Sequence, residues 1–141
     1  MEFKYSERSN DVFKKLKRKY YSIVKSGNDG FGSVQDFILW YEKQKLECFY
    51  CKITEKDCYE IVMNGLLTSG RFPTKGNVKQ GKSRGMYLEI DRSDEPKGKY
   101  SVKNCVLCCY FCNNDKSDIF NRQQYLTFFQ NRTKFLRDLL S

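Results

Sequence analysis

Four of the seven cysteines form two Cys-x-x-Cys pairs, Cys48 with Cys51 and Cys109 with Cys112. A tight turn of this kind presents two thiolates to one ion, and two such turns complete the tetrahedral four-sulfur site that zinc prefers. Because the pairs lie far apart in the chain, a shared ion would tie two distant segments together in place of a larger apolar core. The spacing therefore predicts one structural zinc bound by all four cysteines, with ordinary buried cysteines as the alternative.

The remaining cysteines, Cys58, Cys105 and Cys108, lack this spacing. Cys105 and Cys108 fall within an apolar strand pattern, so we expect both to be thiols of the core. Cys58 fits helix packing, with an outlying metal ligand as the alternative. The odd number of cysteines argues against a complete disulfide framework and favours a cytoplasmic, intracellular protein.

The chain of 141 residues has 26 Lys and Arg against 17 Asp and Glu, which gives a formal net charge of +9. Such an excess on a small protein favours a polyanionic partner, more commonly nucleic acid than a membrane surface. The alternative is a basic surface with no such partner. No segment approaches the roughly 18 apolar residues of a membrane span, and the first residues lack the apolar run of a signal peptide.

The length is that of a single domain, and sequence patterns divide it into a basic helical part (1–47), a core (48–120) and a C-terminal helix (121–141). Apolar periodicity and capping residues predict an α+β fold. We expect strands over 86–91 and 102–108. The expected helices cover 11–26 after Asn10, start at Ser33, run from Thr54 to about Gly65, cover 113–118, and run from Asn121 to Leu140.

Two basic regions could contact phosphates. Between Gly70 and Gly85 the sequence is polar and contains no acidic residue, and we expect Lys79, Lys82 and Arg84 to bind DNA, with a solvated insertion as the equal alternative. Opposite its apolar side, the first predicted helix carries Lys14, Lys15, Lys17, Arg18, Lys19 and Lys25. Such a cluster is typical of a solvated face, and beside a site that acts on nucleic acid it could contact phosphate.

One segment carries a family resemblance. It comprises Leu-Glu-Ile-Asp-Arg-Ser-Asp at 88–94, then Gly98, Tyr100 and Asn104, then Cys-Tyr-Phe-Cys-Asn-Asn-Asp-Lys at 109–116. This pattern resembles the HNH, or ββα-metal, endonucleases, and more closely their phage and restriction-enzyme branch. The resemblance covers roughly residues 20–136 and includes the first cysteine pair. It implies a small zinc-stapled ββα-metal (HNH) domain with flanking helices.

The resemblance also implies an activity, the hydrolysis of DNA phosphodiester bonds by a homing, restriction-like or nicking endonuclease. Asp91 and Asn113 match the family's ligands for a catalytic Mg²⁺ or Mn²⁺, and both supply the oxygen atoms that such ions prefer. Asn104 matches an asparagine that braces the loop between the two strands. Lys116 matches the family's lysine, a candidate contact to phosphate.

The chain departs from the family at the general base. The family has histidine directly after the aspartate, whereas this position is Arg92 and the chain contains no histidine. Arginine stays protonated, so Arg92 can bind phosphate or stabilise developing charge but cannot act as an ordinary base. The candidates to activate the nucleophile are Tyr50 and Tyr87, either with a lowered pKa, and Glu89 on the same strand face as Asp91. Both tyrosines could equally be packing aromatics.

The missing histidine leaves a second function open, a catalytically degenerate zinc-containing module that only binds nucleic acid. The joint presence of Asp91, Asn104 and Asn113 favours the nuclease, because a binding module needs no second metal site. A zinc-organised protein-interaction domain fits the charge poorly. A nuclease this small cuts both strands either as a homodimer or by acting twice. Replacing Asp91 by alanine is expected to abolish cleavage and leave the fold largely intact.

Overall fold

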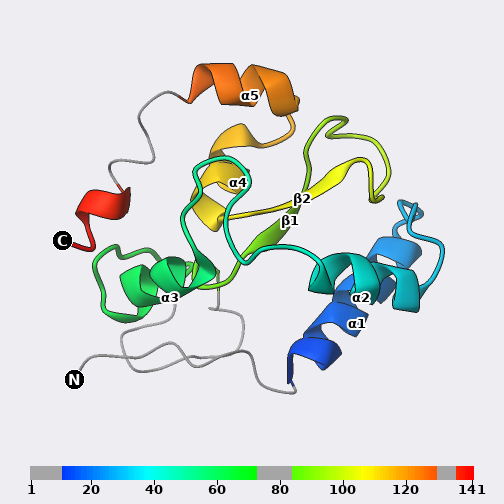
Figure 1. Cartoon of the computed structure of the whole chain (residues 1–141), viewed down its shortest axis with the longest axis horizontal. Coiled ribbons are helices and arrows are strands. Elements are labelled where there is room, and N and C mark those ends of the chain that lie inside the picture. The colour runs from blue at the N-terminus through cyan, green and yellow to red at the C-terminus, as the bar shows by residue number, and fades with distance from the viewer. Residues whose placement is uncertain (1–10, 73–83, 130–135) are drawn as a thin grey trace.

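The computed structural model describes residues 11–72, 84–129 and 136–141 (Figure 1). In chain order its named elements are α1 (Asp11–Lys25), α2 (Val34–Glu42), α3 (Glu55–Met63), β1 (Glu89–Arg92), β2 (Cys105–Cys108), α4 (Tyr110–Lys116) and α5 (Arg122–Phe128). None of the helices within these ranges combines the length and the apolar character that crossing a bilayer would require.

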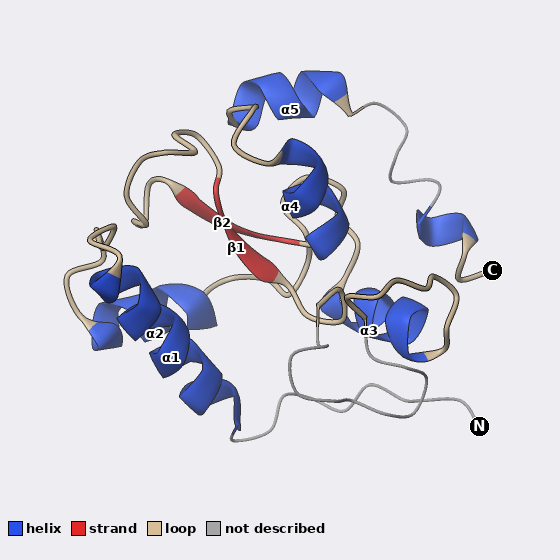
Figure 2. Ribbon diagram, turned by 180° about the vertical axis from the view of Figure 1, so that it is seen from behind, coloured by secondary structure: helices blue, strands red, loops and turns tan. Residues whose placement is uncertain are grey.

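The centre of the fold is an antiparallel hairpin of β1 and β2, in which Glu89 pairs with Cys108 and Arg92 with Cys105. The chain then turns directly into α4, which lies alongside the hairpin. Seen from either side, the hairpin lies between α4 and the pair α1 and α2 (Figures 1 and 2). All four residues of β2 are buried, as expected for a strand with protein on both faces.

Local capping explains where the helices begin. The side chains of Ser33, Thr54 and Asn121 each accept a hydrogen bond from the backbone three residues on, and these caps confirm the predicted starts of α2, α3 and α5. The predicted start of α4 at Asn113 is wrong. Cys109 caps this helix by accepting from the Cys112 amide, so α4 begins at Tyr110.

Three further boundaries differ from prediction. The predicted strands over 86–91 and 102–108 both begin later, because the pairing starts at Glu89 in β1 and at Cys105 in β2. The predicted helix from Asn121 to Leu140 is also wrong as one element, since α5 ends at Phe128, where Phe129 forms its C-cap. The predicted cap Asn10 lies outside the described residues.

The N-terminal helices are joined to the loop of the hairpin through backbone contacts. The Gly30 amide donates to the Tyr100 carbonyl at 2.7 Å, and the Tyr100 amide donates to the Asn28 carbonyl at 2.8 Å. A Cβ atom at Gly30 would lie 2.9 Å from the Tyr100 carbonyl oxygen, so this approach requires glycine. The contact joins the segment between α1 and α2 to the loop between β1 and β2. The helices α1 and α2 and the segment between them form an aromatic core of Tyr20, Phe31, Phe37 and Trp40.

Candidate metal centre and active site

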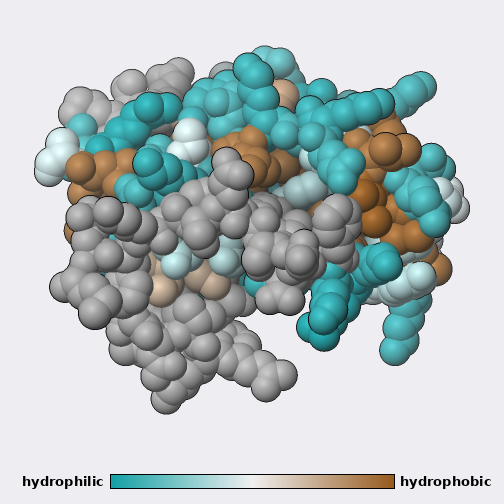
Figure 3. Space-filling model, turned by 60° about the horizontal axis from the view of Figure 1, so that its bottom comes forward, coloured by the Kyte–Doolittle hydropathy of each residue, from teal (hydrophilic) through white to brown (hydrophobic). Residues whose placement is uncertain are grey.

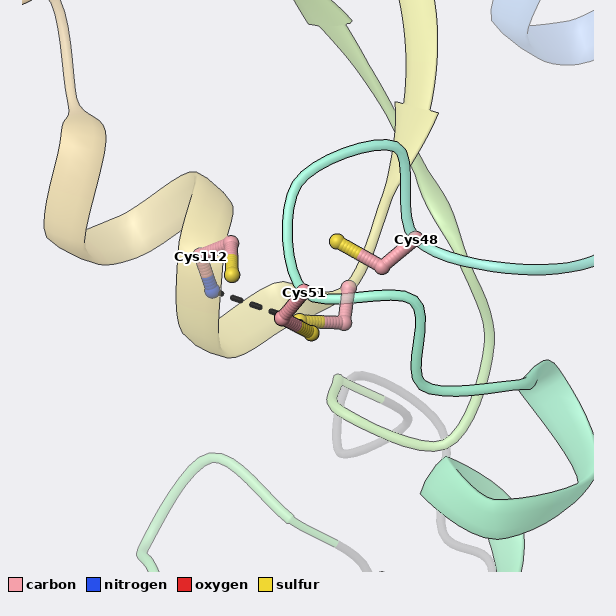
Figure 4. Close-up of side chains that lie close together, drawn as sticks. Cys48, Cys51 and Cys112 are labelled. Carbon is pink, nitrogen blue, oxygen red and sulfur yellow. Dashed lines mark hydrogen bonds between the residues drawn. The ribbon is translucent and has the colours of Figure 1, made fainter. Parts of the chain in front are cut away.

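The four predicted zinc ligands come together. The sulfur atoms of Cys48, Cys51, Cys109 and Cys112 all lie within 4.8 Å of one another, and all four side chains are buried. In Figure 4, Cys48 and Cys51 come from the loop before α3, Cys112 comes from α4, and their sulfurs face one another. The distance between the Cys51 and Cys109 sulfurs is 3.8 Å.

These distances fit zinc. With Zn–S bonds of about 2.3 Å, the sulfurs of a regular tetrahedral site are separated by about 3.8 Å. Hydrogen bonds within the cluster, that with Cys109 first, lower the pKa of Cys48, whereas those of Cys109, that with Cys112 first, raise its pKa, because neighbouring thiolates without a cation repel one another. The loop is also fixed from outside, because the Phe49 amide donates to the Leu107 carbonyl of β2 at 2.9 Å. The cluster therefore joins the loop, the hairpin and α4.

The other three cysteines lie outside the cluster. Cys58, Cys105 and Cys108 are buried and free, as expected of core thiols. Burial raises the pKa of Cys105 to about 11 and that of Cys108 well above its usual range, so both remain neutral thiols near neutral pH. The alternative of Cys58 as an outlying ligand does not fit this arrangement, since it is not a member of the four-sulfur cluster.

Asp91 lies beyond the zinc cluster, on the face of β1 toward α4. Its carboxylate is 6% exposed and accepts a hydrogen bond of 2.5 Å from the Tyr50 hydroxyl. The Lys116 ammonium, which is completely buried, lies 3.3 Å from the same carboxylate oxygen. Because an isolated buried charge is very costly, Asp91 and Lys116 neutralise one another. The loop that carries Cys48 and Cys51, the strand β1 and the helix α4 thus each contribute one of these three side chains.

Glu89 forms the neighbouring cluster, two residues before Asp91 and on the same strand face. One of its carboxylate oxygens accepts a hydrogen bond of 2.8 Å from the Asn113 side-chain amide. Arg84 binds both oxygens, at 2.7 and 2.9 Å, and its guanidinium lies 4.9 Å from the Tyr110 ring. The spacing of Asn113 and Lys116 by three residues puts them on one side of α4, so one meets Glu89 and the other Asp91.

The surroundings of Tyr50 determine the direction in which its pKa shifts. Burial first, and then the hydrogen bond to Asp91, raise the pKa of Tyr50 well above its usual range. This direction is the opposite of the lowered pKa that the sequence analysis expected for an activating tyrosine. The physical cause is that a phenolate beside the Asp91 carboxylate would place two negative charges together in a buried position. Tyr87 lies elsewhere, with its ring packed near Tyr59 and Lys15.

Arg92 and Asn104 organise the loop that joins the strands. The Asn104 side chain accepts from the Asp94 and Glu95 amides and donates to the Glu95 and Lys99 carbonyls. These four bonds close the loop, which is the bracing that the family resemblance implies. The Arg92 guanidinium donates to the Gly98 carbonyl at 3.0 Å and lies 4.8 Å from the Tyr100 ring.

The predicted nucleic-acid contacts have different placements. Lys79 and Lys82 lie outside the described residues. Arg84 is described and is bound to Glu89, next to Asn113. Lys116 has no exposed surface, so a contact with phosphate would require its pair with Asp91 to open.

Sequence reasoning missed three features of this site. It did not assign Arg84 to Glu89, because an ion pair between a basic segment and a strand leaves no local pattern. Arg71, which donates to the Tyr110 hydroxyl at 2.8 Å, was noted only as part of the basic segment. The Lys116 pairing could have been found from helical spacing, since position 116 follows 113 by three residues on the same side of α4.

Comparison with known proteins gives one informative match. No protein-family model matches the sequence, and no curated protein matches it. Among solved structures, the chain is similar to the rare-cutting HNH restriction endonuclease PacI, with a TM-score of 0.66 and 24% sequence identity, over 95% of this chain and 85% of that chain. The similarity confirms the predicted fold, a small α+β domain of the HNH type in which the cysteine cluster can hold zinc.

Proposed function

We propose that this chain, which has the fold of an HNH endonuclease, is itself a metal-dependent endonuclease that hydrolyses DNA phosphodiester bonds. The observation that carries the proposal is the facing arrangement of β1 and α4, where Asp91 and Glu89 lie opposite Lys116 and Asn113. Buried or half-buried carboxylates beside an amide and several cations are costly to assemble for stability alone. PacI, described as a restriction endonuclease, supports the same reading.

Asp91 and Asn113 are the residues that would hold Mg²⁺ or Mn²⁺. Their carboxylate and amide oxygens are the donors that these ions prefer, and the donor set therefore fits. A bound divalent ion would neutralise charge on the scissile phosphate and on the leaving oxygen. Lys116 would balance the charge of Asp91, since its ammonium lies 3.3 Å from the carboxylate. Asn104 would hold the adjacent loop in shape through its four hydrogen bonds.

Of the two candidate tyrosines, we favour Tyr50 for a role at the site, as the group that positions Asp91, because its raised pKa opposes action as a base. Its hydroxyl donates to Asp91, whereas the ring of Tyr87 packs near Tyr59 and Lys15. Glu89 is a weaker candidate for the base, since both of its oxygens already accept from Arg84 or Asn113. Arg92 would contact the phosphate from the loop side of β1, a role suited to a group that stays protonated.

DNA binding would draw on the basic excess of the chain, with Lys79, Lys82 and Arg84 as the first candidates. Phosphate contacts by such residues release counterions, so affinity should fall steeply with salt. Arg84 could exchange Glu89 for a phosphate oxygen, because its side chain is 53% exposed and a guanidinium can bind phosphate through the same pair of N–H bonds as a carboxylate.

The test is incubation of the purified protein with supercoiled plasmid and Mg²⁺ or Mn²⁺, with and without EDTA. We expect metal-dependent cleavage that Asn113→Ala abolishes and Asn114→Ala, a change at the exposed neighbouring residue, retains. Open circles would indicate nicking, and linear product would indicate cleavage of both strands. A protein that binds DNA and leaves it uncut with every divalent ion would instead be the degenerate binding module, the alternative that the Arg92 position favours.

A homodimer remains one of two ways in which this small chain could cut both strands. Sedimentation of the protein alone and with a DNA duplex, measured beside the plasmid assay, separates a dimer from a monomer that acts twice.

A further inference from the structure

One side of α1 faces the hairpin and its loop. The Lys15 ammonium lies 4.9 Å from the centre of the Tyr87 ring, just before β1. The Lys19 ammonium lies 5.3 Å from the centre of the Tyr100 ring, in the loop between β1 and β2. Residues four apart share one side of a helix, so both lysines belong to a single row directed at the candidate active site. Figures 1 and 2 show α1 beside the hairpin in both views.

Lys19 lies near Glu89 and two arginines. It interacts electrostatically with Glu89, Arg84 and Arg92, and desolvation by burial lowers its pKa. Arg92 lies over the same Tyr100 ring as Lys19, at 4.8 Å, and Arg84 binds Glu89 directly. Three cations from three different segments therefore lie within electrostatic range of one another. Such a local excess of positive charge attracts a polyanion.

The partners of Lys15 and Lys19 leave both ammonium groups ready for a stronger ligand. A cation over an aromatic ring at an exposed site is held only weakly, so a phosphate can bind without breaking a strong ion pair. Arg84 differs, because a phosphate must first compete with Glu89 for it. In Figure 3, long hydrophilic side chains surround an apolar area on the side where α1 and α2 lie.

We propose that Lys15 and Lys19 bind backbone phosphates of DNA next to the bond that is cut, so that α1 forms one wall of the DNA-binding surface. The inference rests on the proposed function and adds a second surface to the basic segment of residues 70–85. Of the two alternatives that the sequence leaves open for this face of the helix, it selects the phosphate contact for Lys15 and Lys19 over the solvated face. Bound to α1 in this way, the DNA strand would be oriented toward Arg92, whose guanidinium lies over the same Tyr100 ring as the Lys19 ammonium.

The same helix supplies a matched control. With about 100° of rotation per residue, Lys17 lies on the opposite flank of the buried stripe from Lys15 and Lys19. That stripe consists of Leu16, Tyr20 and Ile23. Lys17 is exposed and has the same charge, so Lys17→Gln removes one cation from α1 without altering the row that faces the hairpin.

The experiment measures DNA affinity by fluorescence anisotropy in EDTA, at a series of salt concentrations, for a labelled duplex. Each phosphate contact contributes about 0.9 to the slope of log affinity against log salt, so Lys15→Gln/Lys19→Gln should lower the slope by about two and the affinity by roughly tenfold. Lys17→Gln should leave the slope near that of the parent. Lys15→Arg/Lys19→Arg keeps both charges and should retain the parent slope.

Each outcome is decisive. If the parent binds DNA and the double glutamine variant keeps its slope, the two lysines only pack on Tyr87 and Tyr100 and the inference is overturned. The same holds if Lys17→Gln lowers the slope as much per charge, because the effect is then one of net charge. If the parent itself does not bind DNA, the proposed function fails and this inference falls with it. Zinc content and thermal unfolding show whether the double variant has lost its fold, in which case Lys19→Gln alone provides the measurement, with an expected loss of about 0.9 in the slope.

Discussion

The cysteine cluster and the Asp91–Glu89 site lie at successive turns of the same helix, yet they are built in different ways. Cys109 and Cys112 at the start of α4 face two sulfurs of one loop, and all four ligands are alike. Asn113 and Lys116, further along, face two carboxylates of β1 and meet groups from other segments. The four sulfurs of the cluster are suited to bind one zinc ion. In the second site, each carboxylate of β1 already contacts a side chain of α4.

The difference shows how one helix can serve two purposes. A closed set of four thiolates leaves no open position for a substrate, as is typical of structural zinc. The carboxylates of the second site instead contact Lys116, Tyr50 and Arg84, and under the proposed function these partners would have to shift when a cation and a phosphate bind. Zinc would thus fix the start of α4 so that Asn113 and Lys116 stay opposite β1.

The largest expected effect tests whether the two regions depend on each other in this way. Cys112→Ser should lose the metal and most of the fold, because structural zinc contributes binding free energy of about 10–16 kcal/mol in small domains. Elemental analysis should find one zinc per chain in the parent and little in the variant, and circular dichroism should show loss of helix.

Cys58→Ala and Cys105→Ala provide the controls, since both thiols are buried and neither belongs to the cluster. They should retain one zinc per chain. A Cys112→Ser protein as stable as its parent would remove zinc from the explanation of the fold.

The second effect separates charge balance from catalysis. Asp91→Ala leaves Lys116 charged, completely buried and unpaired, so it should lower the free energy of unfolding by about 3–5 kcal/mol. The sequence alone led us to expect a variant with an intact fold. Asp91→Ala/Lys116→Met removes both charges and should recover most of the stability while cleavage stays abolished.

Chemical denaturation of the single and double variants measures this coupling. If Lys116→Met alone is as stable as the parent and the double variant is no more stable than Asp91→Ala, the buried pair does not carry the effect. The plasmid assay on the stable double variant then tests Asp91 in catalysis without the complication of unfolding.

The contrast between the two regions also explains what could be predicted from sequence. The zinc ligands follow from spacing within each pair, and the helix starts at Ser33, Thr54 and Asn121 follow from capping chemistry that acts over three residues. The bracing by Asn104 came through family resemblance, and its hydrogen bonds agree with that role. The cysteines and the helix starts are thus predicted from local sequence signals, and Asn104 is predicted from a position that matches the family.

The remaining features depend on contacts between distant segments. Nothing near Tyr50 in the sequence indicates that its hydroxyl reaches Asp91, 41 residues away. The early start of α4 depends on the Cys109 sulfur accepting from the Cys112 amide, a cap that capping preferences based on Ser, Thr, Asp and Asn do not include. The end of α5 at Phe128 was missed because apolar residues continue at a helical spacing beyond it.

A third experiment tests which tyrosine hydroxyl, that of Tyr50 or that of Tyr87, acts at the Asp91–Glu89 site. Tyr50→Phe should lower the cleavage rate by about 10–100-fold, the range for loss of a partner that orients a metal ligand, and leave DNA affinity near the parent value. Tyr87→Phe should cut at close to the parent rate, since the ring contacts with Tyr59 and Lys15 do not require the hydroxyl.

Single-turnover cleavage with saturating protein isolates the chemical step for this pair of variants. Normal cleavage by Tyr50→Phe would exclude its hydroxyl and direct attention to Glu89 or to a metal-bound water. A strong loss in Tyr87→Phe alone would reverse the assignment.

The smallest expected effect concerns how Asn113 is held for a metal. Glu89 accepts from the Asn113 amide nitrogen, which leaves the amide oxygen as the atom able to bind a cation. Loss of such a partner commonly weakens metal binding by 10–100-fold, so Glu89→Ala should lower the affinity for Mn²⁺ by about tenfold, measured by electron paramagnetic resonance without DNA. Glu89→Gln keeps an oxygen that can accept from Asn113 and should bind Mn²⁺ more nearly as the parent does. If Glu89 were instead the general base, Glu89→Gln would lose cleavage while its Mn²⁺ affinity stayed unchanged, and that pattern would overturn the orienting role.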